Sequence, residues 1–152
     1  MLKDQKELLS VFNECGVEYL IVGGQAVNAH GVPRLTKDLD IFVRSSGDNS
    51  EAIYRALAKF GAPIEDYMPA DFRDHPNDIF QFGLPPNRID VLQSIGTLSF
   101  EDAWQHRVRL SVDNAVSAHF ICRDDLIQNK LETGRLQDLA DAEQLQKMKE
   151  EV

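Results

Sequence analysis

The chain has 152 residues, 43% of them hydrophobic and 27% charged, which is typical of one soluble globular domain and not of a disordered chain. Its net charge of −9 at pH 7 disfavours unspecific binding to nucleic acid phosphates or anionic membranes. Cys15 and Cys122 stand in no CxxC pattern, which argues against a zinc site, and no apolar run approaches the length of a membrane span. We therefore expect a cytoplasmic protein with no membrane partner.

The first part of the chain alternates predicted helices with short predicted strands. The helices have apolar side chains at helical spacing or stop at a glycine, and they span residues 2–16, 25–30 and 50–61. The strands are nearly all apolar, as is typical of strands covered on both faces, and they span residues 18–22 and 39–43.

The second part of the chain, after a predicted loop at residues 61–77, predicts two hairpins and a pair of helices. The hairpin strands span residues 78–84 with 88–94, around a turn at 85–87, and residues 108–112 with 115–121. A short helix is expected at residues 100–106, and two further helices follow from Asp124, separated at Gly134. The predicted class is α+β, with a mixed, mostly antiparallel sheet flanked by helices. We expect one domain over residues 1–152, with residues 123–152 as a C-terminal helical pair packed on it.

Asp38 and Asp40 place two carboxylates in an otherwise apolar stretch. Residues two apart on a strand share a face, so both carboxylates point the same way while Leu39 points into the core. Two like charges side by side repel unless a cation lies between them, and Mg²⁺ takes oxygen ligands of this kind. Asp90, alone in a second apolar strand, adds a third carboxylate to that face if the two strands are neighbours. The alternative is that all three are ordinary charges at strand edges.

Gly23 and Gly24 follow a predicted strand and open a predicted helix. Such a turn presents unpaired backbone N–H groups to an anion, and a phosphate site beside a metal site is what a nucleoside triphosphate requires. The alternative is a tight turn that needs glycine only for its positive φ.

The order of these features resembles the nucleotidyltransferase superfamily that shares the DNA polymerase β catalytic fold. The family pattern hG[G/S], Dh[D/E]h and h[D/E]h, where h is apolar, reads VGG, DLDI and IDV in this chain. The likeness covers residues 18–43 and 88–92. It is closest to the small bacterial branch of AbiEii-type toxin transferases and to compact antibiotic transferases, and it implies the polymerase β-like fold.

This resemblance also implies a role for each matched residue. Gly23 and Gly24 would hold the β and γ phosphates of an NTP. Asp38 and Asp40 would ligate two Mg²⁺ ions, for which Mn²⁺ can substitute. Asp90 would ligate the catalytic ion and draw the proton from the acceptor. All three aspartates would thus be catalytic, in the arrangement that two-metal transfer needs.

Three further residues are candidates for nucleotide binding. Gln25 stands where many members of the superfamily have serine, and its longer side chain can still donate a hydrogen bond. Arg34, just before the aspartate pair, either balances the triphosphate or offsets the carboxylates. Lys130 lies four residues after Leu126 on the apolar face of its predicted helix. We expect it to point into the cleft, with the carboxylates of the site as its nearest partners, and we expect Lys130→Met to keep stability near normal.

The late helices hold a second, weaker likeness to the AbiEii-type members. Those proteins carry a lysine, then an arginine, then aspartates, and the segment NKLETGRLQDLADAE is similar. The sequence does not assign roles to Arg135, Asp138 and Asp141, although the first two, three residues apart on one helix face, are equally consistent with a structural ion pair.

We predict from these patterns a metal-dependent nucleotidyltransferase that moves an NMP group from an NTP to a hydroxyl or phosphate acceptor and releases pyrophosphate. The acceptor is a small molecule, a protein hydroxyl or tRNA. One alternative is a non-catalytic protein of the same fold that acts as an antitoxin or regulatory partner in a toxin–antitoxin pair. Another is a protein that binds a divalent ion and no nucleotide.

Overall fold

The structure, a computed structural model, describes residues 1–83 and 87–150 and contains one mixed sheet with the strand order β3-β4-β2-β1-β6-β5. In chain order the elements are α1 (Lys3–Glu14), β1 (Tyr19–Val22), α2 (Gly23–Ala29), β2 (Leu39–Val43), α3 (Gly47–Phe60), the 3₁₀ helix η1 (Pro69–Phe72), β3 (Ile79–Phe82), β4 (Ile89–Leu92), α4 (Phe100–Gln105), β5 (Val108–Val112), β6 (Val116–Phe120), α5 (Arg123–Thr133) and α6 (Leu136–Glu150).

The strand pairing confirms the predicted α+β class with a mostly antiparallel sheet. Strand β1 is antiparallel to β2, and both predicted hairpins form, as β3–β4 and β5–β6. The pairs β2–β4 and β1–β6 are parallel. The turn expected at residues 85–87 lies largely outside the described residues. At the other hairpin, Asp113 and Asn114 both have positive φ, and the Ala115 N–H donates to the Val112 carbonyl at 2.9 Å to close the tight turn.

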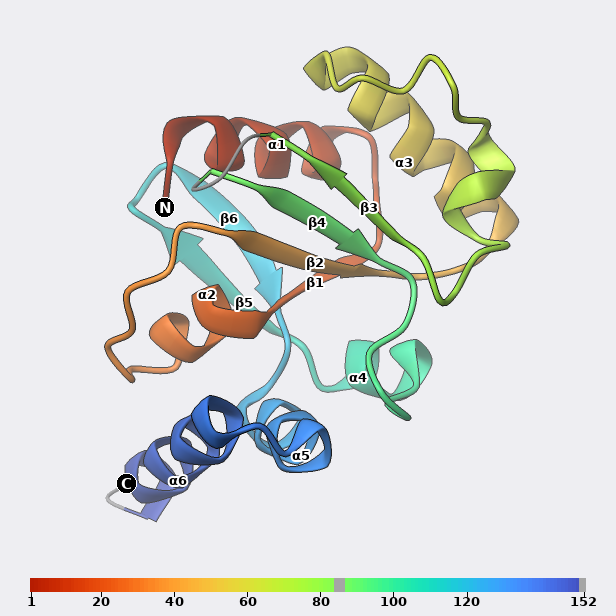
Figure 1. The fold of residues 1–152 in the computed structure, drawn as a ribbon. Helices are drawn as coiled ribbons and strands as arrows, with labels where there is room; N and C mark the ends of the chain where they lie inside the picture. Colours follow the sequence, from red (N-terminus) through yellow and green to blue (C-terminus); the bar gives the residue numbers. More distant parts are fainter. Residues whose placement is uncertain (84–86, 151–152) are drawn as a thin grey trace.

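The helices form a layer on each face of the sheet (Figure 1). Helices α1 and α3 cover one face, while α2, α4, α5 and α6 lie on the other side (Figure 1). The buried core includes side chains from both layers and from the inner strands, such as Phe12 of α1, Leu126 of α5 and Ile41 of β2, all fully buried. Strands β1 and β2 are apolar throughout their length except at Asp40, because helices cover both of their faces.

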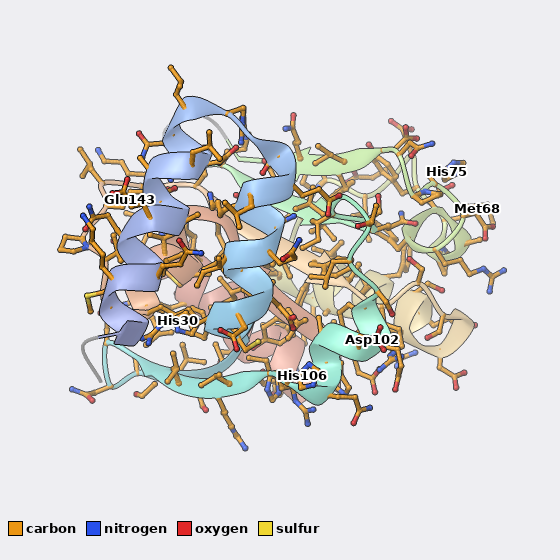
Figure 2. The ribbon with its side chains drawn as sticks, turned by 90° about the horizontal axis from the view of Figure 1, so that it is seen from below. His30, Met68, His75, Asp102, His106 and Glu143 are labelled. Atoms are coloured by element: carbon orange, nitrogen blue, oxygen red, sulfur yellow. The ribbon has the colours of Figure 1, made fainter. Side chains whose placement is uncertain are left out.

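The C-terminal helices α5 and α6 lie side by side below the sheet (Figures 1 and 2). They belong to the same hydrophobic core as the strands, since Leu126 of α5 and Leu145 of α6 are fully buried within it. Gly134, in the left-handed conformation with φ of 70°, ends α5 where the sequence predicts the break.

Two predicted boundaries differ from the structure for local reasons. Helix α3 begins at Gly47, earlier than the predicted residue 50, because the Ser46 side chain accepts a hydrogen bond from the Asn49 N–H and caps the helix there. Helix α2 begins at Gly23, so the Gly-Gly pair is the first turn of the helix. The predicted loop at 61–77 also contains η1. Within the described part of the chain, no helix is both long enough and apolar enough to cross a membrane.

Candidate active site

The three predicted carboxylates lie together on one face of two neighbouring parallel strands. Asp40 of β2 is directly opposite Asp90 of β4, and Asp38 is two residues before Asp40, just before β2 begins. The intervening Leu39 and the following Ile41 are fully buried, as the alternation predicted. The sheet register therefore brings Asp90 to the predicted aspartate pair.

The surroundings of the Asp40 carboxyl group disfavour its charged form. Burial raises its pKa from 3.8 to about 6, the negative charges of Asp90 and Asp38 add to the rise, and a hydrogen bond with the Asp90 carboxyl adds further. The nearby Arg88 guanidinium opposes this rise in the pKa of Asp40 but does not cancel it. The site therefore carries more negative charge than its surroundings neutralise.

Arg88 lies among these carboxylates and was not assigned a role from the sequence. Its Nε donates to Asp90 Oδ1 at 3.0 Å, and its Nη2 lies 3.7 Å from Asp38 Oδ2. The predicted site contained no arginine beside Asp90, so Arg88 is a residue that the structure adds to it. The signal was present in the sequence, because Arg88 is two residues before Asp90 and so shares its face of the strand.

Asp38 and Asp40 open into a cleft of about 260 Å³ between the sheet, the start of α2, the segment before β2 and the helices α5 and α6. The residues that line it include glycines, carboxylates, cations and small polar side chains: Val22, Gly23, Gly24, Arg34, Thr36, Asp38, Asp40, Leu92, Ile95, Asn129, Lys130, Thr133, Arg135 and Asp138. Six of the eight predicted site residues therefore line one cleft, and the two that do not are Asp90 and Gln25.

Gly23 lies against the Asp40 carboxylate. Its φ is +66°, and a Cβ atom added there would be 2.3 Å from Asp40 Oδ2. Both the backbone conformation and the close approach therefore require glycine. Gly24 is next to Thr36, since an added Cβ would lie 3.0 Å from three atoms of that side chain.

Lys130 points into the cleft as predicted, but its partners are not the carboxylates of the sheet. Its Nζ lies 3.2 Å from Asp138 Oδ1 and 3.3 Å from Asp141 Oδ2, and all three side chains are less than a tenth exposed. The expectation that Asp38, Asp40 or Asp90 would hold Lys130 was therefore wrong, because α6 packs beside α5 and supplies two nearer carboxylates.

Asp138 and Asp141 each hold a second cation as well. Arg135 Nε donates to Asp138 Oδ2 at 2.8 Å, which is the ion pair that the sequence left open, and Arg34 donates to Asp141. Burial opposes ionisation of Asp138, but the hydrogen bonds from Arg135 and Lys130 outweigh it and lower the pKa of this carboxyl group. Two buried carboxylates thus fix three cations in this wall of the cleft.

Gln25 is not brought to the cleft. It lines a separate hollow beside Asn28 on α2 and Leu110 on β5, because one step along the helix beyond Gly24 turns its side chain toward a different side. The prediction of Gln25 as a phosphate-binding residue therefore has no support in the geometry.

The cleft therefore combines the carboxylates Asp38 and Asp40 with the cations Arg34, Lys130 and Arg135. The donor set of Asp38, Asp40 and Asp90 fits a hard divalent cation, since it consists of carboxylate oxygens whose mutual repulsion a cation would relieve. As the side chains stand in the described part of the chain, no group of three or more acidic, histidine or cysteine residues is arranged to hold a metal ion. The guanidinium of Arg88 contacts two of the three carboxylates.

The comparisons with known proteins agree with this arrangement. The family described as "Nucleotidyltransferase of unknown function (DUF6036)" matches residues 2–150. The fold is similar to the crystal structure of the lincomycin-bound lincosamide antibiotic adenylyltransferase LnuA, with a TM-score of 0.57, 15% sequence identity, and coverage of 97% of this chain and 98% of that chain. That likeness confirms the predicted fold. No curated protein matches the sequence significantly.

Proposed function

Since this chain belongs to the DUF6036 family of nucleotidyltransferases, we propose that it moves an NMP group from an NTP to a hydroxyl or phosphate acceptor, with divalent metal ions, and releases pyrophosphate. The observation that carries the proposal is the pairing of Asp40 with Asp90 across two parallel strands, because Asp40 lines a cleft that Lys130 and two arginines also line. A metal–triphosphate complex needs carboxylates to bind the metal ions and cations to bind the phosphates.

Asp38, Asp40 and Asp90 are the residues that would hold the metal ions, two Mg²⁺ by the family resemblance. When bound, such ions stabilise the charge on the attacking and leaving oxygens of an in-line displacement. The raised pKa of Asp40, about 6, means that this carboxyl group must lose a proton before it can serve as a ligand.

The cations of the cleft would orient the triphosphate. A lysine ammonium has three N–H donors, and Lys130 directs two toward Asp138 and Asp141, which leaves one for a phosphate oxygen. Arg34 uses one end of its guanidinium on Asp141 and keeps other donors. Gly23 and Gly24 have no side chain to obstruct the approach of a phosphate to the backbone.

We propose that Asp90 takes the proton from the acceptor. In the proposed reaction the acceptor oxygen attacks the α-phosphorus, the bond to the pyrophosphate breaks, and the acceptor proton passes to the Asp90 carboxylate. The side chain of Asp90 is only 9% exposed, and Arg88 fixes its Oδ1 at 3.0 Å. Bulk water therefore has limited access to this base.

For the acceptor we propose a small molecule that carries a hydroxyl group, ahead of a protein hydroxyl or tRNA. The net charge of −9 opposes a large anionic acceptor, and LnuA, whose fold is similar, is an antibiotic adenylyltransferase. The AbiEii-type subgroup, and with it a toxin–antitoxin partner, stays a prediction.

The experiment is a transfer screen with each NTP labelled at the α-phosphate, against pooled aminoglycosides and lincosamides, protein and tRNA in the presence of Mg²⁺. We expect label on one acceptor class with the wild type and none with Asp90→Asn. Metal-dependent NTP binding with no transfer to any pool would favour the non-catalytic regulatory alternative. Stabilisation by Mg²⁺ with no NTP binding would favour a protein that binds the metal alone.

A further inference from the structure

Arg88 occupies the fourth corner of a rectangle whose other corners are the three carboxylates. Asp40 is opposite Asp90 in the parallel β2–β4 pair, and the Leu39 N–H donates to the Arg88 carbonyl at 3.0 Å, which places Asp38 at the level of Arg88. Neighbouring strands are about 4.8 Å apart and residues two apart on a strand are separated by about 6.6 Å. The four side chains therefore share one small area of the sheet.

We propose that Arg88 is a built-in cation of the active site, which competes with the divalent metal ion for Asp38 and Asp90 and so sets the metal concentration that the enzyme needs. This inference rests on the proposed function, because it concerns the same carboxylates. The guanidinium is already within hydrogen-bonding distance of Asp90 and within ion-pair distance of Asp38.

The charges explain why the two cations exclude each other. Arg88 contacts Asp90 Oδ1 and lies near Asp38 Oδ2, so a divalent ion bound through the same oxygens would place its charge directly beside the guanidinium. Arg88 cannot relieve this by deprotonation, because arginine stays charged in proteins. It can only move away. Its side chain is 35% exposed and long, so it can turn toward solvent while its backbone stays in the sheet.

The same geometry predicts that Arg88 stabilises the protein when no metal is present. It is the cation nearest to the buried Asp90, and it opposes the repulsion around Asp40. Removal of Arg88 should therefore have two opposite effects: lower stability without metal, and tighter binding of the metal ion. A purely structural ion pair would show the first effect without the second.

The test compares Arg88→Gln and Arg88→Lys with the wild type by titration with Mn²⁺ alone, followed by the paramagnetic resonance of free Mn²⁺ at pH 8. Because the carboxylates no longer share their oxygens with the guanidinium, we expect the Kd for Mn²⁺ to fall about tenfold in Arg88→Gln, which corresponds to about 1.4 kcal/mol. Arg88→Lys keeps a cation that matches a carboxylate less well, and its Kd should lie between the two.

Arg73→Gln is the matched control, because Arg73 forms its ion pair with the adjacent Asp74 on the surface at 3.2 Å. It should bind Mn²⁺ as the wild type does. Thermal unfolding in a chelator should show a lower Tm for Arg88→Gln than for the wild type, and added Mn²⁺ should remove this difference.

The outcomes separate this inference from the proposed function. If Arg88→Gln and the wild type bind Mn²⁺ with equal affinity, or the variant binds more weakly, the competition by Arg88 is refuted while the metal site stands. If neither protein binds Mn²⁺, both the metal site and the competition are refuted. Should Arg88→Gln fail to fold, Arg88→Lys carries the same comparison, and an unchanged Kd in that variant refutes the inference.

Discussion

Asp40→Asn should raise the free energy of unfolding when no divalent metal is present. The pKa of Asp40 is raised from 3.8 to about 6, so the folded protein holds this proton more tightly than the unfolded chain does. Stability is therefore lost as the pH rises between these two values, and the loss persists above about 6. Asparagine has nearly the same shape, carries no charge and can donate a hydrogen bond to Asp90.

The magnitude follows from the size of the pKa shift. At about 1.36 kcal/mol per unit, the shift corresponds to about 3 kcal/mol at pH 8. Partial contact of the carboxyl with solvent reduces this, so we expect a gain of about 1 to 3 kcal/mol for Asp40→Asn. In a protein of this size that is an increase in Tm of about 2 to 10 °C.

The assay is urea and thermal unfolding in a chelator at pH 5 and pH 8. The gain in the free energy of unfolding from Asp40→Asn should be larger at pH 8 than at pH 5 by about 1 kcal/mol. At pH 8 the Asp40 carboxyl of the folded wild type is charged, whereas at pH 5 it is mostly protonated. Glu143→Gln is the control, since Glu143 lies on the side of α6 away from α5 (Figure 2) and pairs only with Lys147 at 3.3 Å in the described contacts. Its stability should match the wild type at both pH values.

Two results would refute this reasoning. If Asp40→Asn is less stable than the wild type at pH 8 without metal, the carboxylates are not under mutual repulsion. If the variant still gains stability from Mg²⁺ and NTP as the wild type does, Asp40 is not a ligand of the metal.

Three further predictions concern the cleft. Lys130→Met should lower the free energy of unfolding by about 3 kcal/mol, because it removes a cation from the buried Asp138 and Asp141. This differs from the near-normal stability expected from the sequence, and an unchanged urea midpoint would contradict it. Gly23→Ala should lower the free energy of unfolding by at least about 2 kcal/mol in the same assay, since it combines a φ of +66° with a Cβ 2.3 Å from Asp40 Oδ2. A loss under about 0.5 kcal/mol, the effect of an ordinary surface substitution, would show that this position does not require glycine. Metal-dependent NTP binding should weaken as the pH falls below about 6, where Asp40 gains a proton, and calorimetric titrations with equal Kd at pH 5 and pH 8 would exclude that role.

The parts of the fold that sequence reasoning predicted are those that depend on local chemistry. Helix ends at Gly16, Gly61 and Gly134 follow from the positive φ that only glycine adopts without strain. The shared face of Asp38 and Asp40 follows from the two-residue period of a strand. Each of these needs only a few neighbouring residues, and each agrees with the structure.

The parts that sequence reasoning missed depend on how distant elements pack. Arg88 shares the strand face of Asp90 by local spacing, but its place beside Asp38 comes from the parallel register of β2 and β4, which no local pattern specifies. The partners of Lys130 come from α6, and only the packing of α6 beside α5 shows that Asp138 and Asp141 are nearer than the carboxylates of the sheet. Gln25 was misplaced because α2 begins at Gly23, which sets the helical phase of the following residues.

The most direct test of the account is a calorimetric titration of the wild type with each of the four NTPs, with and without Mg²⁺, at pH 8. We predict that at least one NTP binds with a Kd between about 1 μM and 1 mM in Mg²⁺, that binding is lost in a chelator, and that Asp40→Asn does not bind it. A folded wild-type protein that binds none of the four NTPs in Mg²⁺ would contradict the assignment of this cleft as a nucleotidyltransferase site.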